Sequence, residues 1–183
     1  MARLSDRYKN EIIPKLKSQL GYKNSLAVPR IEKIVVSMGV GKAVADEKAM
    51  EGATRELSLI TGQKPLVTKA RKSVSGFKLR KGMPVGCKVT LRGRMMYEFL
   101  DRLINIAIPR FKDFRGLPRN SFDNDGNFNM GISDQAVFPE VEMDKIEFQQ
   151  GMNITIVVGN SDKEKSLVLL SEFGMPFRKS GST

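Results

Sequence analysis

The segment from residue 57 to residue 97 limits the folds open to this chain, because it holds ten basic side chains and no acidic one. Glycine and proline interrupt it, notably in KGMPVG (81–86), so one continuous helix is excluded there. Like charges at this density repel one another, and burying them would cost a large desolvation free energy. We therefore expect strands joined by an exposed basic loop that keeps its cations in water or against a polyanion.

The rest of the chain is nearly balanced in charge. Residues 1–56 hold 11 basic and 7 acidic side chains, and residues 98–183 hold 10 basic and 13 acidic ones. The net charge is +11, so the middle segment carries ten of these eleven charges. Such clustering is typical of a nucleic-acid partner, whose phosphates neutralise the repulsion.

Length and composition favour one compact domain spanning residues 1–183. With 183 residues and 40% hydrophobic side chains, the chain can bury a sizeable core. No apolar run approaches the roughly 18 to 20 residues that span a bilayer, and the N-terminus lacks the apolar core of a secretory signal. Cys87 is the only cysteine, so an intrachain disulfide is excluded, and we expect a cytoplasmic location.

The absence of histidine excludes an imidazole general base, a Ser-His or Cys-His pair and the usual zinc sites. Cys87 could act as a nucleophile, but in VGCKVTL it is better interpreted as a small buried strand residue. The acids near Lys145 have no metal-ligand spacing, so a solvated acidic face is expected rather than a metal site. No cofactor is predicted.

Periodicity predicts helices and strands along most of the chain. The expected helices cover residues 3–20, which Pro14 should kink or divide, 44–62, 95–108 and 161–174, where Ser161 and Glu164 have capping-box spacing. The expected strands cover residues 31–41, 64–70, 84–93 and 152–159, with a hairpin at 121–132 that turns around Asp125-Gly126.

Two strands follow one another at 64–93, which favours an α+β domain with a mainly antiparallel sheet and helices packed on one face. Residues 70–83 then form a long basic loop between strands. Loops of that length are usually functional or mobile. A solvated hairpin tip and an arm that reaches a nucleic acid are both open, and the charge favours the arm.

Several blocks carry a family resemblance: IEKIVVSMGVG (31–41), KSVSGFKLRKGMPVGCKVTLRG (72–93), YEFLDRLI (97–104), FKDFRGL (111–117), VFPEVEMDKI (137–146) and GMPFRK (174–179). They occur in order over nearly the whole chain. The chain resembles the L-five family of large-subunit ribosomal proteins, bacterial type.

The resemblance implies a structural, non-enzymatic ribosomal protein with an RRM-like fold. Its implied partners are 5S rRNA in the central protuberance, 23S rRNA and neighbouring 5S rRNA-binding ribosomal proteins. The long basic loop would contact P-site tRNA, and another surface would form an intersubunit bridge to small-subunit protein S-thirteen. No membrane partner and no homo-oligomer are implied.

Three candidate sites follow. Matching the family's RNA-contacting positions implies Lys33, Ser37, Gln63 and Thr90 for 5S rRNA, and Arg92 and Arg94 are nearby basic candidates. The candidates in the tRNA-contacting loop are Lys72, Phe77, Lys78, Arg80 and Lys81. The candidates for the acidic bridge are Asp134, Glu140, Glu142 and Asp144, because their charge suits the basic small-subunit protein of the family's bridge; a solvated acidic face stays open as the alternative. Phe77 could stack on a base or pack the root of the loop against the sheet, and both interpretations stay open.

Three positions depart from the family pattern. Ser37 replaces the usual asparagine, which has more hydrogen-bond donors. Arg94-Met95 replaces a Glu-Arg pair, and Asn124-Asp125 replaces Gly-Arg. The last change weakens any RNA role for that hairpin.

Two other function classes remain at this point. An RNA-processing enzyme could use the same basic surface, although the basic segment has no carboxylate pair. Binding to a membrane surface would need a basic amphipathic helix with large apolar anchors, whereas the basic segment is predicted as strands and loop.

Overall fold

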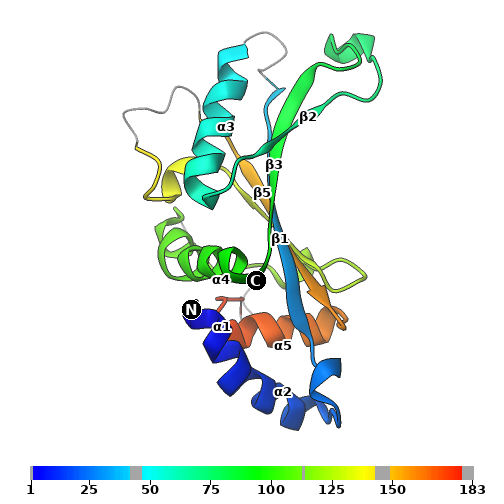
Figure 1. The fold of residues 1–183 in the computed structure, drawn as a ribbon, viewed down its shortest axis with the longest axis vertical. Helices are drawn as coiled ribbons and strands as arrows, with labels where there is room; N and C mark the ends of the chain where they lie inside the picture. The colour runs from blue at the N-terminus through cyan, green and yellow to red at the C-terminus, as the bar shows by residue number, and fades with distance from the viewer. Residues whose placement is uncertain (1, 42–46, 113, 143–148, 179–183) are drawn as a thin grey trace. The chain divides into compact units, whose positions relative to one another are not determined.

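The computed structural model describes residues 2–41, 47–112, 114–142 and 149–178 (Figure 1). Its helices are α1 Arg3–Arg7, a π-helical turn Tyr8–Ile12, α2 Ile13–Leu20, α3 Glu47–Thr61, α4 Gly93–Arg102 with a π-helical continuation Leu103–Ala107, and α5 Lys163–Phe173. Its strands are β1 Arg30–Gly39, β2 Leu66–Lys69, β3 Pro84–Leu91, β4 Phe128–Ile132 and β5 Met152–Gly159.

The strands form one five-stranded antiparallel sheet in the order β2-β3-β1-β5-β4, which confirms the predicted α+β class. When β4 is set aside, the remaining elements β1, α3, β2, β3, α4 and β5 follow the β-α-β-β-α-β order of ferredoxin-like folds. The hairpin predicted near Asp125-Gly126 is present before β4, where Phe122 pairs with Phe128. Gly126 has a φ of +78° there, and a Cβ on it would meet the Asp162 backbone.

The described chain groups into two compact units. One comprises residues 1–34, 92–130 and 155–183, and we name it the terminal unit; the other comprises residues 35–91 and 131–154, and we name it the loop-bearing unit. Strands β1, β4 and β5 each contribute residues to both units. The single-domain interpretation stays a prediction.

In the loop-bearing unit, α3 packs against β3 (Figure 1). Apolar side chains alternate along the strands, so that Met38, Cys87 and Val89 point to the buried face, where Leu57 and Ile60 of α3 are also buried. The Cys87 thiol hydrogen-bonds the Thr54 side chain of α3. One face of this part of the sheet is therefore covered by α3.

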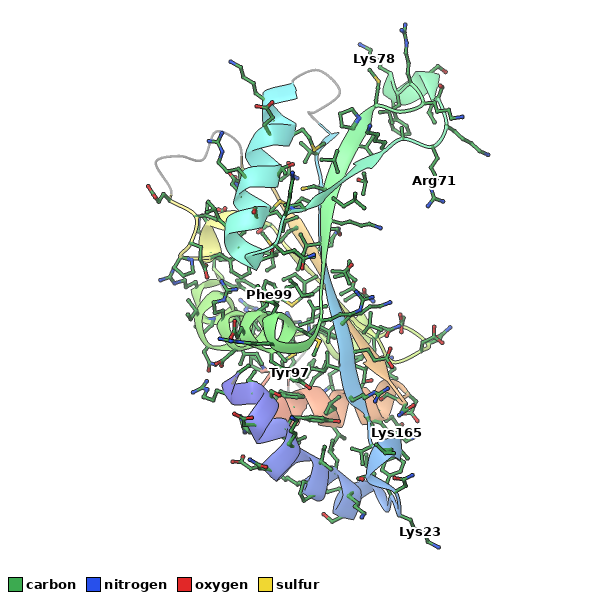
Figure 2. The ribbon with its side chains drawn as sticks, in the orientation of Figure 1. Lys23, Arg71, Lys78, Tyr97, Phe99 and Lys165 are labelled. Atoms are coloured by element: carbon green, nitrogen blue, oxygen red, sulfur yellow. The ribbon has the colours of Figure 1, made fainter. Side chains whose placement is uncertain are left out.

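In the terminal unit, α1 packs on α4, and α5 packs on the π-helical turn. The rings of Tyr8, Tyr97 and Phe173 lie 5.8 to 6.4 Å apart, and Phe99 is fully buried. Tyr97 and Phe99 belong to α4 and are labelled in Figure 2. The Tyr8 hydroxyl donates to the Pro29 carbonyl at 2.9 Å. Burial raises the pKa of Tyr8 to about 12, so this donor stays protonated at physiological pH.

The N-terminal helix continues past Pro14, where a kink or a division was predicted, but it changes to a π-helical turn just before this residue. Pro14 lies in the first turn of α2, directly after the π-helical turn Tyr8–Ile12. Proline has no N–H to donate, and its ring crowds the carbonyl four residues earlier, which is that of Asn10. The wider π-helical turn accommodates this without ending the helix.

The predicted capping box of α5 is wrong. Asp162, one residue later, caps the helix: its Oδ1 accepts the Lys165 N–H at 3.0 Å. The Ser161 hydroxyl instead lies 2.8 Å from the hydroxyl of Ser166, a side chain that is fully buried. Gly174 ends the helix in the left-handed conformation, with φ of +99°.

We predict that Asp162→Ala lowers the free energy of unfolding by about 1 kcal/mol at pH 7, because the helix loses its cap. Asp162→Asn should change it little, since asparagine caps about equally well. Two hydrogen bonds lower the pKa of Asp162: the bond from the Lys165 side chain has the larger effect, and the bond from the Lys165 backbone N–H has the next largest. The difference between wild type and Asp162→Ala should therefore be complete above about pH 4 and shrink below it, as the pH falls through the lowered pKa. Urea unfolding between pH 2 and pH 7 measures this, and an equal loss in both variants would contradict the capping role.

Candidate nucleic-acid interface

The basic loop at residues 70–83 is a small hydrogen-bonded structure. Val74 and Leu79 exchange two backbone hydrogen bonds, of 2.9 and 3.1 Å, around a short 3-10 turn, Ser75–Phe77. Nearer the sheet, the Ala70 N–H donates to the Met83 carbonyl at 2.8 Å. The segment between β2 and β3 is thus a loop whose two arms are hydrogen-bonded to each other.

A side chain contributes to this closure. The Lys81 N–H donates to the Ser73 hydroxyl at 3.0 Å, and the Gly82 N–H donates to the Ala70 carbonyl at 2.9 Å. These bonds join the two arms of the loop between the 3-10 turn and the sheet. The loop thus presents its side chains from a defined backbone.

The candidate side chains of the loop lie on its surface. Arg71 and Lys78 extend from the outer end of the β2–β3 ribbon (Figure 2), and Lys72, Arg80 and Lys81 are also exposed. Within the described ranges, no ion pair engages these five cations. Their charges are available to a polyanion.

Phe77 is 73% exposed. A ring that anchored the root of the loop against the sheet would be largely buried, so the structure does not support that interpretation. An aromatic face beside several cations is suited to stack on a base or sugar.

The second candidate surface is the sheet face opposite α3 in the loop-bearing unit, which we name the open face. Side chains alternate along a strand, and Cys87 and Val89 point toward α3, so Lys88 and Thr90 point to the open face. Ser37 lies there too, between the buried Val36 and Met38 of β1. Two candidate residues, Ser37 and Thr90, thus share one face on neighbouring strands.

Gln63 lies directly after α3. The buried Thr61 hydroxyl donates to the Leu57 carbonyl at 2.6 Å and lies 3.2 Å from the Gln63 carbonyl, which orders the backbone at this helix exit. The Gln63 side chain is exposed, so its amide can bind a partner.

The remaining candidates belong to the terminal unit. Lys33 is half-buried on β1, and Arg92 is exposed directly before α4. Arg94 is also exposed, but it donates to Glu98 one helical turn later at 2.6 Å. This hydrogen bond raises the pKa of Arg94. The i, i+4 spacing of Arg94 and Glu98 is the signal in the sequence that indicates this pair.

The acidic candidates do not share one environment. Asp134 caps the 3-10 turn Gln135–Val137, with its Oδ1 accepting the Ala136 N–H at 2.9 Å. Glu140 is half-buried and Glu142 exposed, and both line a cavity of about 610 Å³ beside α3. Asp144 lies outside the described residues. Over the ranges that the structure covers, no three His, Cys, Asp or Glu side chains gather as a metal site would require.

Comparison with known proteins identifies the family. The family model described as ribosomal protein L5 matches residues 24–80, and the model of the C-terminus of the same ribosomal family matches residues 84–177. The large ribosomal subunit protein uL5 of Chromobacterium violaceum is 57% identical over 97% of this chain and 99% of its own length. The large ribosomal subunit protein uL5 of Colwellia psychrerythraea is 55% identical over 98% of this chain and 99% of its own length.

The chain belongs to the ribosomal protein L5 family. The predicted identity and ribosomal location are thereby confirmed, and the chain is a structural, rRNA-binding protein of the large subunit. Because members of the L5 family are not enzymes, the RNA-processing alternative is set aside. No helix in the described ranges is long and apolar enough to cross a membrane.

Cys87 fits this non-catalytic role. Its side chain is 1% exposed, and burial raises the pKa of its thiol to about 11. At neutral pH the residue is therefore a protonated thiol inside the core, and the nucleophilic thiolate is nearly absent. In this member of the L5 family, Cys87 is a packing residue.

Proposed function

We propose that this L5-family chain binds 5S rRNA and helps to attach it, beside 23S rRNA and neighbouring 5S rRNA-binding proteins, in the central protuberance. The observation that carries the proposal is the open face, where Ser37, Lys88 and Thr90 are accessible and the described strand residues include no acid. A face that offers one cation and several hydroxyl groups suits the phosphates and 2′-hydroxyls of RNA.

Each proposed contact has its own chemistry. Lys33 supplies charge for a phosphate, whereas Gln63 and Thr90 supply an amide and a hydroxyl for sugar or base edges. Ser37 is shorter than the asparagine usual in the family, so a bridging water can complete its contact. Arg92 is exposed for a phosphate, while Arg94 has to exchange Glu98 for RNA.

We predict that isolated binding to 5S rRNA is strongly salt-dependent. Lys33→Gln should weaken binding and reduce the slope of log affinity against log salt by roughly 0.7 to 0.9, which corresponds to one released counterion. Gln63→Ala and Thr90→Val should each weaken binding with little change in slope, because they remove no charge. Filter binding between 50 and 300 mM salt measures this (about the range over which such slopes are linear), and a salt-independent affinity would count against the proposal.

The basic loop is proposed to contact P-site tRNA. It extends beyond the sheet at the outer end of the β2–β3 ribbon, and its cations and Phe77 are exposed (Figure 2). Its internal hydrogen bonds mean that little backbone entropy would be lost on binding. The loop can therefore reach an RNA different from the one on the open face.

We predict that neutralising Lys78, Arg80 and Lys81 together, each to Gln, weakens P-site tRNA retention by roughly three- to a hundredfold, because each exposed contact contributes about 0.2 to 1 kcal/mol. Affinity for 5S rRNA should stay within about twofold, since the open face is unchanged. Ribosomes reconstituted with the variant and a 5S rRNA binding assay measure the two effects. Equal losses in both assays would contradict the separation of loop and open face.

The acidic segment is proposed to contribute to an intersubunit bridge with small-subunit protein S-thirteen. Glu142 is exposed, and Glu140 lies beside it at the cavity next to α3. Acidic side chains repel RNA and attract a basic protein. Exposed charge pairs are individually weak, which suits an interface that rearranges as subunits rotate.

We predict that reversing Glu140, Glu142 and Asp144 to Lys impairs subunit joining at low salt more than at high salt, because the Debye length falls from about 30 Å at 0.01 M to about 10 Å at 0.1 M. Binding to 5S rRNA should persist. A matched variant with Glu11, Asp125 and Glu164 reversed carries the same change in charge and should join normally. Light scattering of mixed subunits measures joining, and normal joining of the first variant at low salt would refute the bridge.

A further inference from the structure

Leu66 is an apolar side chain in an unusual place. It lies on the edge strand β2 and is 63% exposed. Solvent-facing positions of an antiparallel sheet are normally polar, and a flat apolar edge invites unwanted pairing. Its neighbour Val67, by contrast, pairs with the buried Cys87 on the α3 side.

The strand register places a cation beside this leucine. Leu66 is directly opposite Lys88 of β3. Directly opposite residues point to the same face, with Cβ atoms about 4.5 to 5.5 Å apart. Both side chains therefore lie on the open face, and the Lys88 side chain is exposed.

The next strand adds a hydroxyl to the row. The Val40 N–H donates to the Val85 carbonyl at 3.0 Å, and such a bond joins opposite residues of an antiparallel ladder. Counting three residues along each strand places Ser37 opposite Lys88. A Cβ on Gly86 would lie 3.4 Å from the Gly39 Cα, which agrees with this register. Leu66, Lys88 and Ser37 thus form a row across three strands.

The neighbouring row of positions on the open face has few side-chain atoms. It consists of Thr68, Gly86 and Gly39, so two of its three positions carry no side chain. Gly86 is needed for packing, because a Cβ there would meet the Met38 carbonyl oxygen. Gly39 has open space, with no atom within 4 Å of a Cβ built on it. The row of three side chains therefore lies next to exposed main chain at two glycines, which the sugar-phosphate backbone of a ligand can approach closely.

We propose that the row Leu66–Lys88–Ser37 holds one nucleotide of the RNA that the open face binds. Leu66 packs against the base or ribose, the Lys88 ammonium pairs with the phosphate, and the Ser37 hydroxyl bonds the 2′-OH. Lys88 adds a positive charge next to Ser37, whose side chain is shorter than the asparagine usual in the family. The inference rests on the proposed binding of 5S rRNA, and it adds Leu66 and Lys88 to the contacting residues.

The charge of the open face favours RNA over a second copy of the chain as its partner. The described strand residues of the open face in this unit include no carboxylate, and the basic loop joins two of these strands, β2 and β3. A second copy of the chain, pairing edge to edge through β2, would bring Lys64, Lys69 and Lys88 close to the same lysines of the other copy. A polyanion meets no such repulsion.

The test compares Leu66→Thr and Lys88→Gln with wild type in 5S rRNA binding, with thermal unfolding as a check on folding. Threonine suits an edge strand, and Lys88 is exposed, so both variants should fold. Leu66→Thr should lower affinity about five- to twentyfold, as expected when an exposed leucine is buried in the complex. Lys88→Gln should lower affinity and reduce the salt slope by roughly 0.7 to 0.9.

Matched controls are available on other surfaces. Leu59, on α3, is 54% exposed, so Leu59→Thr makes the same change away from the open face. Lys17→Gln removes an exposed cation from α2. Both controls should bind within about twofold of wild type.

Each outcome decides between the alternatives. Losses in both row variants but not in the controls support the inference. Wild-type affinity in both row variants, or a loss in Lys88→Gln alone, overturns it and leaves the proposed function standing. A wild-type chain that failed to bind 5S rRNA would remove the proposed function and the inference together. Self-association that Leu66→Thr abolishes, with unchanged RNA affinity, would assign the row to a second copy instead.

Discussion

The packing of α3 on one face of the β2–β3–β1 sheet is the interaction on which the proposed RNA surface depends. Met38, Cys87, Val89, Leu57 and Ile60 are buried at this contact. Strand side chains alternate between faces, so burying one set forces Ser37, Lys88 and Thr90 onto the other. A register shift of one residue would reverse both faces. The hydrophobic core therefore also decides which polar groups are presented.

Charge is separated along the chain in a way that matches this arrangement. Of the ten cations of residues 57–97, Lys64 lies just before β2 and the other nine belong to β2, the basic loop, β3 and the start of α4. In contrast, α3 holds three acids and two cations, and the 134–142 segment holds three acids and no cation. An RNA surface must exclude carboxylates, because unpaired acids repel phosphates. Because α3 covers the opposite face of the sheet, its acids lie away from the open face and do not repel phosphates bound there.

The basic loop shows how a segment of like charges can be ordered before it binds. Backbone hydrogen bonds at Val74, Leu79 and Ala70, and the Ser73 hydroxyl, hold the turn, while the cations point outward. Because these side chains are exposed, water and salt screen their mutual repulsion, and the backbone bonds can hold the turn. A loop closed in this way loses less conformational entropy on binding than a free chain would.

Short-range patterns in the sequence are enough to predict the local features of this protein. The strand and helix positions, the irregular helical turn next to Pro14, the hairpin at Gly126, the acid-free segment and the family blocks all follow from short-range periodicity, turn chemistry or composition. Features that depend on residues far apart in the chain became clear from the folded structure. It assigned the α5 cap to Asp162, while Ser161 bonds the buried Ser166, and it left Phe77 73% exposed. It also aligned Leu66, Lys88 and Ser37, since cross-strand register is set by the core that forms between sheet and helix and not by any one strand.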